Sequence, residues 1–157
     1  GRGTSNCFTA DGAEIDVREA IEDAIKNYPV NASEIILAGF SMGGYGAYRI
    51  YHEYPGMFKG IAVFSGHPNL ATQWLGEGYP DFLDTAYLKT FRNTPVFIYH
   101  SKNDLNCPYD LTLQLVAKLK SAGARVELVT TNEGGHGIID KEYLPQYFKW
   151  VKDTIEE

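Results

Sequence analysis

Four short apolar segments alternate with amphipathic segments along this chain, and that alternation limits the folds open to it. The apolar segments predict four strands, at 34–40, 60–65, 95–100 and 125–131. Around them, apolar residues recur at helical spacing, which predicts helices at 14–28, 42–54, 109–122 and 141–156. Nearly continuous apolar strands that are joined by helices are typical of a parallel sheet with helices on both faces. We therefore expect an α/β fold in which the strands lie in their chain order.

The size and composition of the chain predict one domain. It has 157 residues, 44% of them apolar, and no linker or internal repeat divides it. A chain of this length buries about 68–70% of the surface that its unfolded form exposes, so its core needs no disulfide or metal. The irregular segment 66–94 lies between two predicted strands and is a candidate lid or insert. We expect a single domain over residues 1–157.

Charge and hydropathy argue against two classes of partner, nucleic acids and membranes. Acidic residues outnumber basic ones by 20 to 14, which gives a net charge of −6, and the cations are scattered. Nucleic-acid binding needs clustered cations, so a nucleic-acid partner is not expected. No run approaches the ~18 apolar residues that a membrane span requires, so no membrane partner is expected either. Cys7 and Cys107 lack metal-ligand spacing, and two free thiols are favoured over one disulfide.

The sequence Gly-Phe-Ser-Met-Gly at 39–43 fits the pattern G-x-S-x-G at the point where a predicted strand meets a predicted helix. A turn tight enough to expose the hydroxyl of Ser41 forces an unfavourable backbone conformation on that serine. Flanking residues without side chains make such a turn possible, and Gly39 and Gly43 fit that need. We expect Gly44 and Gly46 to let the following helix pack closely on the sheet.

A serine hydroxyl is a weak nucleophile, so it needs an adjacent base that an acidic group orients. After the G-x-S-x-G pattern the expected chain order is serine, acid, histidine, and Asp104 and His136 fit that order. Asp104 follows the third predicted strand and His136 follows the fourth. Because parallel strands end at one edge of the sheet, we expect Ser41, Asp104 and His136 to meet there.

Three motifs resemble the esterase-type α/β-hydrolases, including prolyl-oligopeptidase-like, feruloyl/acetyl-esterase-like and polyester-depolymerase-like enzymes. They are Gly-Phe-Ser-Met-Gly-Gly-Tyr-Gly-Ala at 39–47, His-Ser-Lys-Asn-Asp at 100–104 and Gly-Gly-His-Gly at 134–137. The resemblance implies acyl transfer to water without a cofactor or metal. Ser41 would be the nucleophile, His136 the general base and then acid, and Asp104 the orienting carboxylate. The backbone N–H of Met42 would be one oxyanion donor.

Other residues near these motifs are candidates for substrate binding. Phe40 precedes the serine, His67 follows the second predicted strand, and Trp74 and Tyr79 belong to the aromatic segment 66–94. Those aromatic side chains would either form a lid or acyl pocket or simply cover the sheet, and the two readings have equal weight. His100 is expected to shape the loop that carries Asp104.

The resemblance favours a serine hydrolase that acts on small-molecule or polymer-linked carboxylic esters. Two alternatives stay open, a peptidase of the prolyl-oligopeptidase type and a binding module that has lost catalysis. The family's sheet is larger than four strands, so we expect this chain to be the carboxyl-terminal portion of a larger hydrolase. It would then lack the second oxyanion donor and be weakly active or inactive by itself. The edge of strand 34–40 would need cover from an amino-terminal segment, a partner chain or a second copy.

Overall fold

The four predicted strands form one parallel sheet in the computed structural model, which describes residue 8 and residues 13–157. Each strand pairs in parallel with the next one along the chain, so the order in the sheet is β1-β2-β3-β4. The strands are β1 (Ile36–Phe40), β2 (Gly60–Phe64), β3 (Pro95–Ser101) and β4 (Arg125–Thr131). This architecture confirms the predicted α/β class and the predicted strand order.

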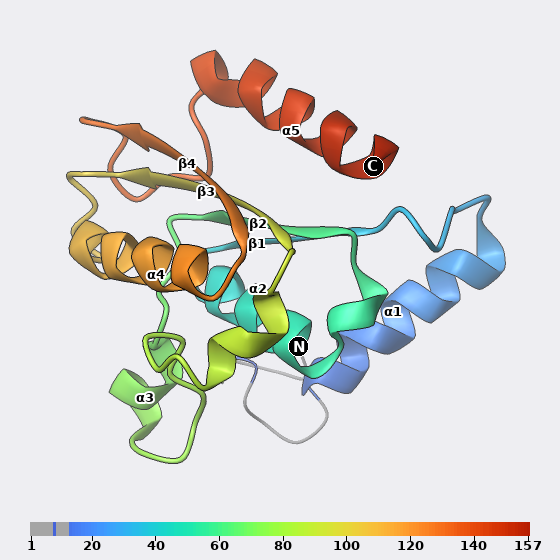
Figure 1. The fold of residues 1–157 in the computed structure, drawn as a ribbon, viewed down its shortest axis with the longest axis horizontal. Coiled ribbons are helices and arrows are strands. Elements are labelled where there is room, and N and C mark those ends of the chain that lie inside the picture. The colour runs from blue at the N-terminus through green and yellow to red at the C-terminus, as the bar shows by residue number, and fades with distance from the viewer. Residues whose placement is uncertain (1–7, 9–12) are drawn as a thin grey trace.

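Helices cover both faces of the sheet, as the sequence predicts (Figure 1). The helix α5 lies on one face, and α2 and α4 lie on the other, with α1 beside α2. Short 3-10 turns occupy 55–57, 87–91 and 141–143. The helices are α1 (Ala13–Asn27), α2 (Met42–Glu53), α3 (Leu70–Leu75), α4 (Tyr109–Ser121) and α5 (Leu144–Glu156).

The central strands are apolar throughout because each face of the sheet has its own core. In β2, Ile61 and Val63 pack in the cluster beneath α2 and α4, whereas Ala62 and Phe64 pack in the cluster beneath α5. All five residues of β2 are buried. Successive side chains of a strand point to opposite faces, so a strand buried on both sides loses the usual alternation of apolar and polar residues.

The segment 66–94 divides between core and surface. Phe82, Leu88 and Phe91 are fully buried in the cluster beneath α2 and α4. Trp74, at the end of α3, is 58% exposed. Phe82 and Phe91 pack against Tyr48 of α2, so this part of the segment belongs to the core, and the part around α3 remains a candidate lid.

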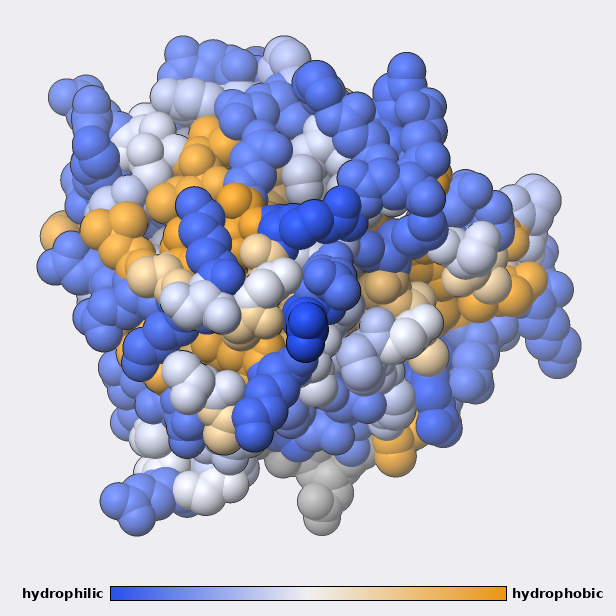
Figure 2. All heavy atoms as spheres, in the orientation of Figure 1, coloured by the Kyte–Doolittle hydropathy of each residue, from blue (hydrophilic) through white to orange (hydrophobic). Residues whose placement is uncertain are grey.

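The described surface carries no continuous apolar face on the side shown in Figure 2, where hydrophilic side chains interrupt the hydrophobic patches. Among the described residues, no helix is long and apolar enough to cross a membrane.

The strand β1 lies at an edge of the sheet, and among the described residues it pairs only with β2. It is half-buried rather than fully buried, because no strand of the described part of the chain lies on one side of its backbone. We expect a further segment, a partner chain or a second copy to cover this edge, since an open apolar edge promotes association.

Size-exclusion chromatography of residues 1–157 tests whether the edge of β1 promotes association, and self-association is the expected result. A monodisperse monomer at every concentration would contradict it.

Candidate active site

Ser41 lies in the sharp turn between β1 and α2, in a strained backbone conformation. Its φ is 55° and its ψ is −119°, which only glycine adopts without strain. Backbone hydrogen bonds hold the turn. Ser41 N–H donates to Phe64 O of β2 at 3.0 Å, and Gly44 N–H donates to Ser41 O at 2.9 Å. The side chain makes no cap bond to the helix, so the hydroxyl is available for another partner.

Gly39 makes this turn sterically possible. A Cβ at Gly39 would lie 2.0 Å from the carbonyl oxygen of Gly43, a backbone atom that cannot move aside. Gly43 differs from the prediction, because a Cβ there would meet nothing within 4 Å. What matters at Gly43 is its carbonyl group, which occupies the space that a side chain on residue 39 would need.

The next two glycines of α2 have different neighbours. A Cβ at Gly44 would lie 2.8 Å from Gly66 Cα and from Val63 Cγ1, so Gly44 does let α2 approach the sheet closely. A Cβ at Gly46 would instead lie 2.3 Å from the ring of Phe8. The prediction that Gly46 serves packing on the sheet is therefore wrong, because its face of α2 turns toward Phe8.

The structure brings Ser41, His136 and Asp104 together in one chain of hydrogen bonds. His136 Nδ1 lies 2.9 Å from Asp104 Oδ2, and His136 Nε2 lies 2.8 Å from Ser41 Oγ. A carboxylate only accepts, so Nδ1 carries the proton, and Nε2 of the neutral ring accepts from the Ser41 hydroxyl. Ser41 follows β1, Asp104 follows β3 and His136 follows β4, so all three lie at the carboxyl edge of the sheet.

Backbone donors fix the carboxylate of Asp104, whose side chain is fully buried. The N–H groups of Asn106 and Cys107 donate to Oδ1 at 2.8 and 2.9 Å. Burial by itself would raise the pKa of Asp104, but hydrogen bonds from Cys107, His136 and Asn106 outweigh it and hold that pKa below its usual value of 3.8. Asp104 is therefore ionised at neutral pH.

Two small polar residues that the sequence analysis did not single out hold the loop of His136. Asn103 Oδ1 accepts from Gly135 N–H at 2.7 Å, and Ser65 Oγ–H donates to Gly137 O at 2.7 Å. Ser65 follows the carboxyl end of β2 and Asn103 follows that of β3. This position is the signal in the sequence that could have identified them. They fix the loop on either side of the imidazole.

A hollow of about 410 Å³ opens beside Ser41. Among the residues that the structure describes, its lining contains no carboxylate or ammonium group, which suits an uncharged ligand. The lining residues are Ser41, His67, Leu70, Gln73, Trp74, Leu105, Asn106, Cys107 and His136.

The four predicted substrate-binding residues have different positions. His67 and Trp74 line the hollow. Phe40 contacts the site in another way, since the centroid of its ring lies 4.9 Å from the centroid of the His136 ring. Tyr79 is not in the lining, and it packs against the core cluster beneath α2 and α4.

Two buried groups that face the hollow, the imidazole of His67 and the thiol of Cys107, are uncharged at neutral pH. Burial and the nearby His100 lower the pKa of His67 from its usual 6.5, against smaller opposing effects of Asp81, Gln73 and Asp104. Cys107 carries a free thiol, and burial raises its pKa to about 11.

Cys7 lies outside the described residues. No group of three or more potential metal ligands occurs in the described part of the chain.

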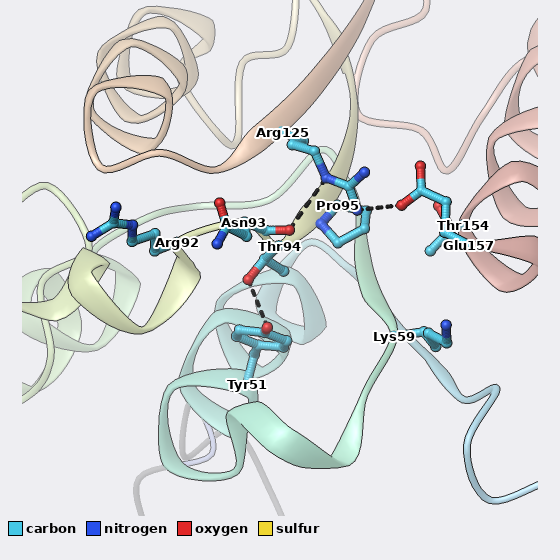
Figure 3. A pocket seen from close by; sticks show the side chains of 9 residues that line it. All are labelled: Tyr51, Lys59, Arg92, Asn93, Thr94, Pro95, Arg125, Thr154 and Glu157. Atoms are coloured by element: carbon cyan, nitrogen blue, oxygen red, sulfur yellow. Dashed lines mark hydrogen bonds and ion pairs between the residues drawn. The ribbon is translucent and has the colours of Figure 1, made fainter.

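A second hollow, of about 320 Å³, lies at the opposite edge of the sheet, where β3 and β4 begin (Figure 3). Arg125 donates there to Asn93 O and pairs with Glu157, and Tyr51 bonds to Thr94. Its lining, within residue 8 and residues 13–157, includes no serine, cysteine or histidine. The first hollow is therefore the candidate active site.

The buried histidines predict a loss of stability in mild acid. The pKa of His67 and that of His100 lie below 6.5 in the folded chain, mainly because of burial. Below about pH 6.5 the unfolded chain then binds more protons than the folded one, so the free energy of unfolding falls as the pH falls toward the folded pKa values. Urea unfolding between about pH 7.5 and about pH 5 measures this. His100→Gln should give a shallower pH dependence, and an unchanged slope would contradict the assignment.

The two glycines that flank Ser41 provide a matched pair. Gly39→Ala should lower the free energy of unfolding by about 1–3 kcal/mol or more, because its Cβ collides with backbone. Gly43→Ala should stay within about 1 kcal/mol of the parent, since its Cβ meets open space. Urea unfolding of both variants measures the difference. Equal effects would show that the steric account of the turn is wrong.

Solved structures share the fold of this chain. SOBER1 of Arabidopsis thaliana aligns with a TM-score of 0.67 and 22% identity over 90% of this chain and 62% of its own. A Bacillus cereus carboxylesterase aligns with a TM-score of 0.65 and 20% identity over 90% of this chain and 60% of its own. For the Pyrococcus horikoshii acylaminoacyl peptidase the TM-score is 0.75 and the identity 18%, over 92% and 28% of the two chains. The fold is that of the α/β-hydrolases.

Sequence comparison gives the family. MhqD of Bacillus subtilis (strain 168), which is named as a hydrolase, is 26% identical over 140 residues, or 89% of this chain. This chain spans 62% of the length of that relative. The profile of the prolyl oligopeptidase family matches residues 13–156. The chain therefore belongs to the prolyl oligopeptidase family, a family of serine hydrolases.

Proposed function

We propose that this protein cleaves carboxylic esters through an acyl-serine intermediate formed on Ser41. The observation that carries the proposal is the unbroken hydrogen-bond chain, 2.8 Å from Ser41 Oγ to His136 Nε2 and 2.9 Å from His136 Nδ1 to Asp104 Oδ2. Such a chain gives the serine a base and the base a fixed orientation.

The reaction then has two halves. Ser41 Oγ attacks the ester carbonyl while His136 Nε2 takes its proton, and the imidazolium, stabilised by Asp104, returns that proton to the departing alcohol. In the second half a water attacks the acyl-serine, gives a proton to His136, and releases the acid as the proton returns to Ser41. The charged oxygen of each tetrahedral intermediate would accept from Met42 N–H. As the first residue of α2, Met42 has no acceptor within the helix for that N–H group.

The hollow supports an uncharged ester as the substrate. Apolar Leu70 and Leu105 and the exposed indole of Trp74 supply contact area, while Gln73 and Asn106 supply hydrogen-bonding groups. His67 and Trp74 are proposed to contact the substrate. The part of the segment 66–94 around α3 would then serve as the lid of the site.

A peptidase is the second candidate, and the family match supports it. The same residues would cleave an amide, because the nucleophile and the proton transfers are identical. Against it, no carboxylate lines the described hollow to bind the amino terminus of a peptide. A binding module without catalysis is less consistent with the site, since the aligned serine, histidine and carboxylate would have no use.

Labelling by a fluorophosphonate probe tests the nucleophile. The protein should be modified at Ser41, and Ser41→Ala should abolish both labelling and hydrolysis of p-nitrophenyl esters, because no other described hydroxyl lies against His136 Nε2. Asp104→Asn should keep Ser41 in place but lower kcat by about 10⁴-fold through the wrong imidazole tautomer. Ser121→Ala, on the exposed end of α4, is the matched control and should keep full activity.

The outcomes separate the alternatives. Hydrolysis of uncharged esters without cleavage of aminoacyl amides supports the esterase, and the reverse preference supports the peptidase. The test is made on the full-length protein, and a folded full-length protein that neither reacts with the probe nor turns over any substrate would show that the proposed function is wrong.

A further inference from the structure

A second imidazole, that of His100, touches the same carboxylate as His136 but has no access to the hollow. His100 is the sixth residue of β3 and is completely buried. Val96 and Ile98 precede it on the same face of the strand, and both are buried apolar residues of the core beneath α4. An apolar side chain would be the ordinary occupant of such a position, so the polar ring needs a specific reason.

The contacts of His100 determine its tautomer. Nε2 lies 2.9 Å from the carbonyl oxygen of Cys107 and 3.3 Å from Asp104 Oδ2. Both of these atoms only accept, so Nε2 carries the proton and shares it between them. Nδ1 lies 2.7 Å from Thr112 Oγ1, and in a neutral ring it accepts from that hydroxyl. Burial lowers the pKa of His100, which keeps the ring neutral despite opposing effects of Cys107 and Asp104.

These contacts join three elements around the acid. Thr112 belongs to α4, His100 is the penultimate residue of β3, and Cys107 belongs to the loop that carries Asp104. The N–H of Cys107 donates to Asp104 Oδ1 while its carbonyl accepts from His100, so one peptide on each side of Cys107 is fixed. A loop tied in this way has little freedom to move the carboxylate.

We propose that His100 is a positioning residue, whose Nε2–H holds the carbonyl of Cys107 and the carboxylate of Asp104 so that Oδ2 stays aligned with His136. Thr112 fixes the tautomer that makes this possible. The inference rests on the proposed function, because it assigns His100 a role in the same reaction. His100 does not touch substrate, so it acts on kcat through Asp104 and His136.

Substitution of His100 by glutamine or by asparagine tests the roles of its two ring nitrogens separately. The amide nitrogen of glutamine reaches the place of Nε2, whereas asparagine reaches only the place of Nδ1. His100→Asn should therefore lower kcat by about 10- to 100-fold with little change in KM, because a misaligned catalytic group costs rate rather than binding. His100→Gln should restore most of the rate. Thr112→Val should lower kcat more than Thr112→Ser, since only serine keeps the hydroxyl that donates to Nδ1.

Two readouts distinguish positioning from mere loss of packing. The first is kcat per folded molecule, which His100→Asn should lower and His100→Gln should largely restore, whereas a loss of packing lowers only the folded fraction. The downfield proton resonance of His136 Nδ1–H, measured by NMR, should persist in His100→Gln and disappear in His100→Asn. His52→Asn is the control, since His52 lies on α2 and bonds to the carbonyl of Tyr87.

Either of two results would overturn the proposal. His100→Asn could match the parent in kcat and in the Nδ1–H resonance, or all His100 variants could lose activity only in proportion to the folded protein lost, with the Nδ1–H resonance kept in His100→Asn. The NMR readout needs no turnover, so it tests the role of His100 even in a protein without activity. Failure of the proposed function shows separately, as absence of Ser41 labelling in the parent protein.

Discussion

The buried carboxylate of Asp104 is the constraint around which the carboxyl edge of the sheet is organised. A carboxylate removed from water is stable only when hydrogen-bond donors replace the water that it loses. Four donors do so here, two backbone N–H groups on Oδ1 and two imidazoles on Oδ2. They come from the acid loop itself, from β3 and from the loop after β4. Satisfying one charge thus fixes the relative positions of three segments.

Strain at Ser41 complements this arrangement. A non-glycine residue at φ 55° costs of the order of 1–3 kcal/mol, and the surrounding structure must hold it there. The bond from Ser41 N–H to Phe64 O ties the turn to β2, and the absence of a Cβ on Gly39 leaves room for the carbonyl of Gly43. The strain places the hydroxyl where His136 reaches it, so the backbone of the turn and the buried acid position the two ends of one hydrogen-bond chain.

Local sequence patterns were sufficient for the parallel sheet and for the three residues that are hydrogen-bonded at its carboxyl edge. Apolar runs such as Ile61–Phe64 identify strands buried on both faces, and the chain order of Ser41, Asp104 and His136 identifies the residues that meet at one edge. The same patterns could not show that Gly43 faces open space or that Gly46 faces Phe8, because both depend on where the rest of the chain packs. Nor could they single out Asn103 and Thr112, since short polar side chains look alike in sequence whether they bond to a neighbouring loop or to solvent.

Burial gives the two imidazoles on Asp104 different chemistry. The side chain of His136 is 19% exposed and lines the hollow, which gives Nε2 the access to a bound molecule that the proposed mechanism needs. The side chain of His100 has no exposed surface, and both of its nitrogens are engaged by protein groups. A second proton on His100 would have no solvent around it to compensate its charge. In the proposed mechanism, His136 is therefore the histidine that exchanges protons with a bound molecule, because of the two histidines on this carboxylate oxygen only His136 is open to the hollow.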